Sequence, residues 1–481
     1  MAYPDRLSPL DASFLHIENA TSHMHVAGVL IFRGSAPRYS DFLKHIAARL
    51  DHVPRYRQRL AWVPFGQGRP VWVDDEHFDL RYHVRATALP APGSEYELQV
   101  LAGRVFSLRL NREKPLWEMW LVEGLSDNRF AVLSKTHHAM VDGISGVDIL
   151  TVLFGEPDPS SESWTPRPTP SDGELLTSAL SDRLATPAEE AVRGVRWFLR
   201  QPVRAVSEGA RLAGDVGDML LAGARPAPTA PWNRGATGSD RRFTWVRGDL
   251  ARVKAVKNAL GGTVNDVMLA VVAGGLRRWL ERRGEPTKEL KAFVPVSVRS
   301  TEQEGSLGNQ VTGVLALLPV GVADPAARLS SISSQMRGVK ESGQAVGASA
   351  LTSLGAGFAQ GNLLSLGARL TASRQRVANL VVTNVPGPQQ ELRMGRYELL
   401  DLFPMVPLGG NLRLGVAILS YNGKISFGLV GDFDAMPDLE ALAEDFSAAV
   451  VELEEAAGID SPGPGGRGGA KAVRKDKALT S

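Results

Sequence analysis

The stretch that most constrains this chain covers residues 130–154, where an apolar segment, a polar turn and a second apolar segment follow one another. Residues 130–134 are apolar and partly β-branched, which predicts a buried strand. Residues 144–154 carry apolar side chains at helical spacing, which predicts a helix. Turns that follow a rigid strand are common positions for catalytic side chains. The polar residues of this turn are two histidines, an aspartate and a glycine: His137, His138, Asp142 and Gly143.

The two histidines should have different roles, because successive residues of a strand face opposite sides. His137 and His138 therefore should not both point into one pocket. An imidazole has an ordinary pKa of about 6.5, so it can accept a proton near neutral pH. We expect one ring to act as a general base and the other to pack and to brace the turn.

Length and composition describe an ordinary globular protein with more than one core. A chain of 481 residues should form two domains. Its net charge of +2 gives no overall field that would favour nucleic acid. The absence of cysteine excludes disulfides and thiol catalysis, and it is typical of a cytoplasmic protein. We expect no signal peptide at residues 1–6 and no membrane-spanning helix.

A segment rich in proline, serine and threonine at residues 156–170 ends the first domain. The linker that follows contains a basic amphipathic helix at residues 186–201 and a second helix at about residues 205–221. Packing between the two domains is the commoner role of such helices, and contact with an anionic lipid surface is the alternative. We predict an N-terminal domain, a linker, a C-terminal domain and a disordered tail over residues 1–158, 159–238, 239–457 and 458–481.

The N-terminal domain should place a second strand beside the histidine strand. Residues 114–121 predict a strand that is joined to it by a polar turn, and two such strands form a hairpin. Trp117 and Trp120 in that strand are more often core residues than substrate contacts. Ser94 begins a capping box, which predicts a helix from there, and Ser40 is expected to cap another. His23 and His25 have no third ligand at a recognisable spacing, so we expect no metal site.

The C-terminal domain should begin with a strand near residue 241. Thr263 is expected to cap a long helix with Asn265 and Asp266 in its first turn, where an aspartate offsets the helix dipole. Pro295 implies an edge or a bulge in its strand. Asn422 followed by glycine predicts a tight hairpin. Further strands are predicted at residues 309–319 and 378–385, and a last helix at residues 439–453.

Taken together, five short motifs resemble those of one family, the bacterial wax ester synthase/diacylglycerol acyltransferases. This family belongs to the CoA-dependent acyltransferase superfamily, with chloramphenicol acetyltransferases and peptide-synthetase condensation domains. The resemblance runs in register from about residue 7 to residue 455. Each motif is weak alone, and the set is specific. The motifs are residues 7–11, 115–117, 137–143, 263–267 and 384–388.

The resemblance implies an α/β (α+β) fold of two chloramphenicol-acetyltransferase-like domains, each a mixed sheet with helices. The active site would lie in a tunnel between them. The second histidine, His138, would be the base that deprotonates the acceptor hydroxyl as it attacks the acyl-CoA thioester. Protonated His138 would then assist departure of the CoA thiol. No acyl-enzyme, metal or cofactor is implied, because acyl-CoA enters as a substrate.

Further roles follow from the same resemblance. Asp142 would point away from the histidine and pair with Arg299, which would hold the turn and tie the two domains. Gly143 suits a turn that needs a residue without Cβ. Asn265 would donate to the oxyanion, with helix capping as the alternative. Residues 384–388 would shape the tunnel. The substrate-channel motif is Pro115, Leu116 and Trp117.

The favoured function is therefore acyl transfer from acyl-CoA to diacylglycerol or to a long-chain alcohol. A condensation-type enzyme with a carrier-bound donor or an amine acceptor is one alternative. A non-catalytic lipid-binding protein is the other, although an intact His138 argues against it. Peripheral contact with a membrane or a lipid inclusion is also expected. The sequence does not rank the two acceptors, because that choice depends on the shape of the tunnel.

Overall fold

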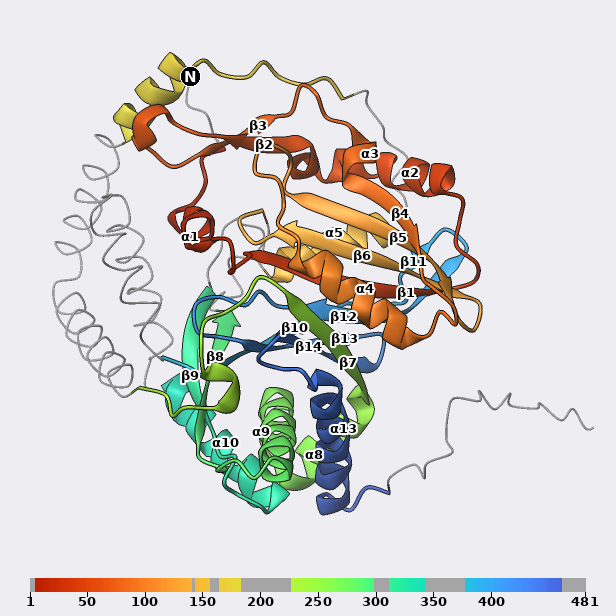
Figure 1. Cartoon of the computed structure of the whole chain (residues 1–481), viewed down its shortest axis with the longest axis vertical. Coiled ribbons are helices and arrows are strands. Elements are labelled where there is room, and N and C mark those ends of the chain that lie inside the picture. Colours follow the sequence, from red (N-terminus) through yellow and green to blue (C-terminus); the bar gives the residue numbers. More distant parts are fainter. Residues whose placement is uncertain are drawn as a thin grey trace, which may run out of the picture.

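The computed structural model describes residues 5–140, 143–155, 164–182, 226–297, 311–341 and 377–460. Two six-stranded sheets form the body of the molecule, and a small sheet of β2 (Gln58–Ala61) and β3 (Val71–Asp74) lies beside the first. Figure 1 shows the first sheet with its helices in the upper half of the view and the second in the lower half. The expected division into two sheet-and-helix halves is therefore confirmed.

The first sheet places the histidine strand at its centre. β6 (Arg129–His137) pairs antiparallel with β1 (His25–Arg33) on one side and with β5 (Trp117–Leu125) on the other. The predicted hairpin is thus confirmed. The remaining strands are β4 (Val84–Ala88), β11 (Arg393–Met394) and β12 (Tyr397–Met405), in the order β11-β12-β1-β6-β5-β4. The helices of this half are α1 (Pro9–Ile17), α2 (Tyr39–Ala47), α3 (Leu80–His83), α4 (Glu95–Ser107) and α5 (Gly143–Phe154).

The second sheet is mixed, because β10 runs parallel to both of its neighbours while the other pairs are antiparallel. Its strands follow the order β7-β14-β13-β10-β8-β9. They are β7 (Arg241–Asp249), β8 (Leu290–Ser297), β9 (Val311–Leu318), β10 (Leu380–Pro386), β13 (Leu414–Tyr421) and β14 (Lys424–Asp432). The helices are α8 (Leu250–Leu260), α9 (Val264–Arg282), α10 (Pro325–Glu341) and α13 (Leu439–Ala456).

Strand β12 comes from the C-terminal part of the chain but belongs to the first sheet. It pairs antiparallel with β1, with Leu402 opposite Leu30. The second sheet then packs on it closely, since a Cβ built on Gly428 of β14 would lie only 1.7 Å from the Pro404 backbone oxygen. An apolar cluster that includes Phe403, Trp245 and residues of α4 fills the space between the sheets. The two halves therefore share strands and core.

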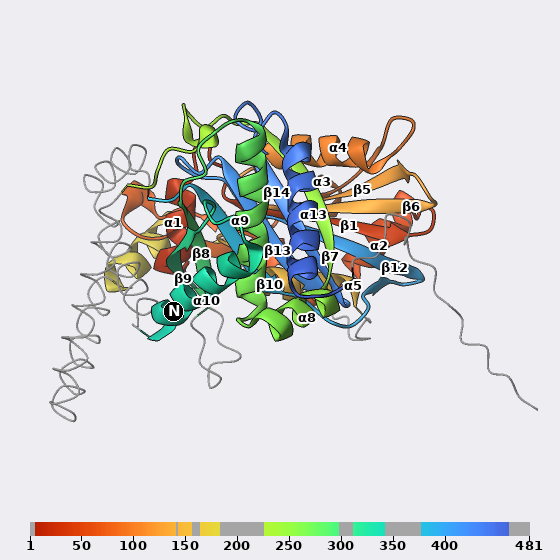
Figure 2. The same ribbon diagram turned by 90° about the horizontal axis from the view of Figure 1, so that it is seen from below.

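Helix α9 is the central element of the second half. Every residue from Asp266 to Leu276 is buried, and Figure 2 shows α9 and α13 side by side. Among the described residues, no single helix is long and apolar enough to cross a membrane. The bent pair α8–α9 reaches that length and composition only when both helices are counted together, and in this fold α9 is a core helix.

Local signals placed several element ends correctly. Ser94 and Thr263 both head capping boxes, and the Asn422-Gly423 turn joins β13 to β14 with positive φ at both residues. The expectation for Ser40 was wrong. Helix α2 begins at Tyr39 after Arg38, whose side chain makes no capping hydrogen bond.

Pro295 shows how a proline fits an interior strand. β8 lies between β9 and β10, but it pairs with β10 only at Ala292 and Phe293. Pro295 lies beyond that short ladder, so one side of its backbone needs no donor. β8 is therefore an interior strand that becomes an edge strand only near Pro295.

Several predicted features lie outside the described residues. They are both linker helices, most of the tail, and the proposed ion pair of Asp142 with Arg299.

Candidate active site

The backbone of the histidine turn is held by two neighbouring segments and by one hydrogen bond within the turn. The His137 N–H donates to the Leu116 oxygen at 2.9 Å, and the His138 N–H donates to the Met24 oxygen at 2.8 Å. The Met140 N–H closes the turn on the His137 oxygen at 2.9 Å. The turn is therefore held by the segments that lead into β1 and β5, and its shape does not depend on side chains alone.

His138 presents its ring beside helix α1. The imidazole stacks on the ring of Phe14, with the centroids 4.1 Å apart and the planes 23° from parallel. His138 is half-buried as a residue, whereas its neighbour His137 is buried. An aromatic ring packed on one face fixes the plane of the imidazole and leaves its edge for proton transfer.

Helix α1 begins where it does because of the motif at residues 7–11. The Ser8 hydroxyl oxygen accepts from the Asp11 N–H at 3.0 Å, and Pro9 occupies the first turn, where its missing N–H costs nothing. The physical role of this motif is thus to start the helix that carries Phe14 to His138. From the sequence alone, the motif was recognised by its resemblance to the family, and no role in positioning Phe14 was predicted.

His137 is the buried member of the pair, with 1% of its surface exposed. Its Nδ1 accepts from the Ala139 N–H at 3.0 Å, so the neutral ring carries its proton on Nε2. That nitrogen lies 3.7 Å from the Glu18 carboxylate. The unequal environments of His137 and His138 agree with the alternation expected along a strand.

Glu18 is a site residue that sequence reasoning missed. It follows α1 as its C-terminal cap, and its side chain is 1% exposed. Arg112 donates to its Oε2 from Nε at 2.8 Å and from Nη2 at 2.5 Å. Burial alone would raise the pKa of the Glu18 carboxyl, but His137 and Arg112 outweigh it and hold the pKa well below its ordinary value. A single glutamate in a polar stretch carries no pattern that would have identified it.

The motif Pro115-Leu116-Trp117 packs behind the turn. Trp117 is fully buried between Tyr56 and His83, with ring centroids at 4.4 and 4.7 Å. Its Nε1–H donates to the backbone oxygen of Tyr56 at 2.8 Å. These contacts give the motif a supporting position, and a direct contact of its side chains with substrate stays a prediction.

Asn265 lies in the first turn of α9. Its Oδ1 accepts from Asn384 Nδ2 at 3.2 Å, so its own Nδ2 remains available as a donor. The cap of α9 is made by two other residues: the Thr263 hydroxyl accepts from the Asp266 N–H at 3.2 Å, and the Asp266 carboxylate accepts from the Thr263 N–H at 2.8 Å. Asn265 takes no part in this cap, which removes the alternative role expected for it.

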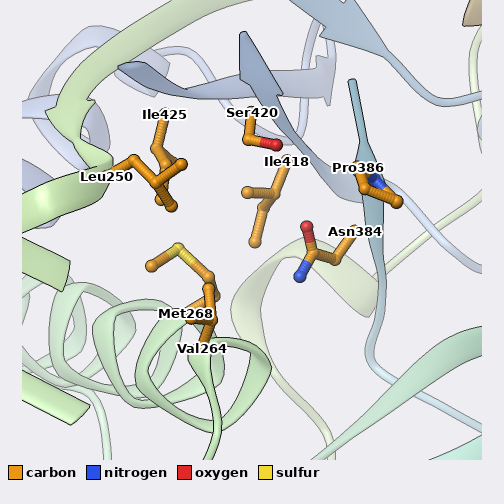
Figure 3. Close-up of a pocket in the computed structure, with 8 residues that line it drawn as sticks. All are labelled: Leu250, Val264, Met268, Asn384, Pro386, Ile418, Ser420 and Ile425. Atoms are coloured by element: carbon orange, nitrogen blue, oxygen red, sulfur yellow. The ribbon is translucent and has the colours of Figure 1, made fainter. Parts of the chain in front are cut away.

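A cavity of about 280 Å³ opens beside the Asn265–Asn384 pair. Val264 and Met268, one helical turn apart on α9, form its lower wall in Figure 3. Asn384 and Ser420 bring polar groups to one part of the wall, while the rest is apolar. The remaining lining residues are Leu250, Pro386, Ile418 and Ile425.

The histidine turn and the second sheet meet through α5. This helix begins at Gly143, five residues after His138, and contacts β10, the strand that carries Asn384. Its last residues, Leu153 and Phe154, share an apolar cluster with Leu419 of β13. The helix that follows the histidine turn therefore packs against the second sheet, beside the strand that carries Asn384.

Comparisons with known proteins agree over nearly the whole chain. The sequence profile of the wax ester synthase/diacylglycerol acyltransferase catalytic domain matches residues 7–268, and that of the WS/DGAT C-terminal domain matches residues 307–454. A putative diacylglycerol O-acyltransferase of Mycobacterium tuberculosis is 34% identical over 469 residues, which cover 94% of this chain and 90% of the relative. A second, named a probable diacylglycerol O-acyltransferase, is also 34% identical and is covered completely.

Solved structures give the same result. The wax ester synthase/diacylglycerol acyltransferase from Marinobacter aquaeolei VT8 is 31% identical and superposes with a TM-score of 0.65, covering 94% of this chain and all of that one. The first condensation domain of the calcium-dependent antibiotic synthetase has a TM-score of 0.60 at 16% identity, over 94% of this chain and 96% of that one. The latter shows the fold alone, and it confirms the fold class that the resemblance implied. The chain belongs to the wax ester synthase/diacylglycerol acyltransferase family, whose members are acyltransferase enzymes.

Proposed function

We propose that this protein transfers a long-chain acyl group from acyl-CoA to the hydroxyl of diacylglycerol or of a long-chain alcohol, with His138 as the general base. The observation that carries the proposal is the geometry of His138. Its backbone is fixed by Met24 and its ring plane by Phe14, yet the residue is only half-buried. Family membership gives the reaction class, and this geometry supports the choice of His138 over His137.

In the proposed reaction, His138 first accepts a proton from the acceptor hydroxyl and then donates it to the leaving thiolate. His138 takes the proton of the acceptor hydroxyl while the oxygen forms a bond to the thioester carbon. The tetrahedral intermediate then collapses, the carbon–sulfur bond breaks, and protonated His138 returns its proton to the CoA thiolate. The ester leaves with the acyl group and the imidazole is again neutral, so no acyl-enzyme is needed.

Asn265 is the proposed donor to the oxyanion. Its Nδ2 is free of the cap of α9 because Thr263 and Asp266 make that cap. It also lies in the first helical turn, where the dipole favours a developing negative charge. The adjacent apolar cavity suits an alkyl chain of one substrate, since such pockets are mostly apolar with a few placed polar groups.

Purified protein given radiolabelled palmitoyl-CoA tests the proposal, with hexadecanol and dioleoylglycerol offered separately. We expect labelled ester from at least one acceptor, and the ratio of the two products measures the preference. His138→Ala should abolish ester formation. His77→Ala is the matched control, because it removes the same type of side chain from an exposed position.

Two other outcomes would support the alternatives. No ester with either acceptor, but labelled amide with an amine acceptor or a carrier-bound donor, would indicate condensation-type chemistry. Binding of palmitoyl-CoA without any turnover would indicate a lipid-binding protein that kept the fold.

Peripheral contact with a lipid surface remains part of the proposal. It rests on the basic pattern at residues 186–201, which lies outside the described residues, and on the low solubility of the proposed acceptors. Flotation with vesicles that contain anionic lipid tests it, and recovery of the protein only in the soluble fraction would contradict it.

A further inference from the structure

One buried carboxylate near the histidine turn has no part in the reaction described above. The Glu18 side chain is 1% exposed and accepts two hydrogen bonds from Arg112. Arg109, which is half-exposed, lies 3.6 Å from the same oxygen. A buried charge costs free energy unless it is paired, and Arg112 supplies that pairing for Glu18.

What Glu18 faces is the imidazole of His137. Nε2 of that ring lies 3.7 Å from the carboxylate, and Nδ1 accepts from the Ala139 N–H at 3.0 Å. The ring thus faces a negative charge at one edge, and at the other edge it is hydrogen-bonded to the backbone of the residue after His138. A rotation of the His137 ring would release the Ala139 N–H and change the shape of the turn that presents His138.

Helix α1 reaches both histidines with two side chains. Phe14 stacks on His138 and Glu18 faces His137. Glu18 follows the last residue of α1 as its C-cap, four residues after Phe14, so the C-terminal end of α1 supports both rings. Arg112 then ties this end of α1 to the loop before β5.

We propose that Glu18 is a positioning residue, which acts through His137 to fix the turn that presents His138. This inference rests on the proposed function, in which His138 is the base. Glu18 fixes the proton of His137 on Nε2, keeps Nδ1 as the acceptor for Ala139, and so sets the direction of the neighbouring imidazole. It touches neither substrate nor the reacting atoms.

Glu18→Gln gives the first test, because glutamine keeps the volume and removes the charge. We expect kcat to fall about 10²-fold, the size of effect that a small misplacement of a catalytic group produces, while KM stays unchanged. Glu113→Gln is the matched control, because Glu113 is exposed in the same loop as Arg112. A Glu18→Gln enzyme with the kcat of the wild type would overturn the proposal.

A double-variant cycle separates positioning from general support of the fold. If Glu18 acts through His137, then Glu18→Gln and His137→Gln remove the same arrangement. Their combination should then lower kcat no further than either change alone. If the double variant instead lowered kcat by the product of the two single reductions, the two residues would act independently, which would contradict the assignment.

The double variant Glu18→Gln/Arg112→Gln guards against misfolding, because it removes both charges of the ion pair and leaves neither without its partner. We expect folded protein, judged by an unfolding midpoint near that of the wild type, with the same reduced kcat. Failure of both variants to fold would mean that Glu18 serves the fold alone, which overturns the proposal. The His138→Ala result stands apart from all of these, so failure of the general-base function would be recognised separately.

Discussion

The two histidines of the turn differ in what touches each ring. The His138 ring stacks on Phe14 and the residue is half-buried. His137 is buried, with its Nδ1 hydrogen-bonded to the Ala139 N–H and its Nε2 3.7 Å from the Glu18 carboxylate. A base must exchange a proton with a substrate, so the less buried residue is the suitable one. The enclosed ring of His137 suits a residue that supports the turn through a fixed orientation.

The role of Asn265 can be tested without disturbing the fold. Asn265→Ala should lower kcat by about 10²–10³-fold, the loss typical for one oxyanion donor. The unfolding midpoint should hardly move, since Thr263 and Asp266 still cap α9. Asn258→Ala, at an exposed position on α8, is the control. Unchanged turnover in Asn265→Ala would assign the oxyanion to another donor.

The charge of Glu18 should appear in the pH dependence of stability. Its pKa is lowered in the folded state, so the ionised group stabilises the fold above its ordinary pKa of 4.5, and this contribution is lost as the pH falls below that value. Wild-type protein should therefore lose more stability between pH 7 and pH 4 than Glu18→Gln does. Urea midpoints at the two pH values measure the difference, and parallel losses would contradict it.

The histidine pattern was predictable because its residues are neighbours in the sequence. Phe14 and Glu18 were not identified, because what ties them to the histidines is the pairing of β1 with β6 and the direction of α1. One local signal was present: a helix capped by Ser8 carries Phe14, and Glu18 follows four residues later at its C-terminal end. Without the fold, nothing indicated what that end of the helix would meet.

At the level of elements, those with local end signals were predicted best. A capping box or an Asn-Gly turn lowers the free energy of one boundary, whatever the rest of the chain does. The prediction for Ser40 failed because the cap position lies two residues earlier, at Arg38, and the helix begins at Tyr39. Membership of β12 in the first sheet was not predictable, since its pairing with β1 joins segments from opposite ends of the chain.

The cap of α1 should matter for catalysis as well as for stability. Ser8→Ala removes the hydroxyl that accepts from Asp11, which costs about 1 kcal/mol. Because α1 carries Phe14 and Glu18, kcat should fall too. Ser94→Ala is the matched variant, since Ser94 caps α4. It should lower the unfolding midpoint similarly and leave kcat unchanged. Equal kcat in both variants would show that the cap of α1 does not affect the active site.

At the scale of the whole molecule, we expect the site to depend on the docking of the two halves. The predicted pair of Asp142 with Arg299 would join them, and removing one side of a buried pair costs about 3–5 kcal/mol. Asp142→Ala should therefore lose folded protein as well as activity, and Arg299→Ala should do the same. Combining the two changes should cost less than their sum. Fully active, well-folded Asp142→Ala would refute the pair.

The packing of the second sheet on β12 gives the most direct test of this dependence. A Cβ at Gly428 would lie 1.7 Å from the Pro404 oxygen, so Gly428→Ala must push β14 away from β12. Overpacking of this kind costs about 1–3 kcal/mol. It should also lower kcat, because the histidine turn and Asn265 come from opposite sides of this contact.

Gly248→Ala is the matched control for that change, because it lies in the same sheet and its Cβ would meet nothing closer than 3.7 Å. It should leave both the unfolding midpoint and kcat near their wild-type values. If Gly428→Ala lowered stability but left kcat intact in the folded fraction, the close contact of β14 with β12 would serve only the core. The geometry between His138 and Asn265 would then have to be set elsewhere, by the contact of α5 with β10.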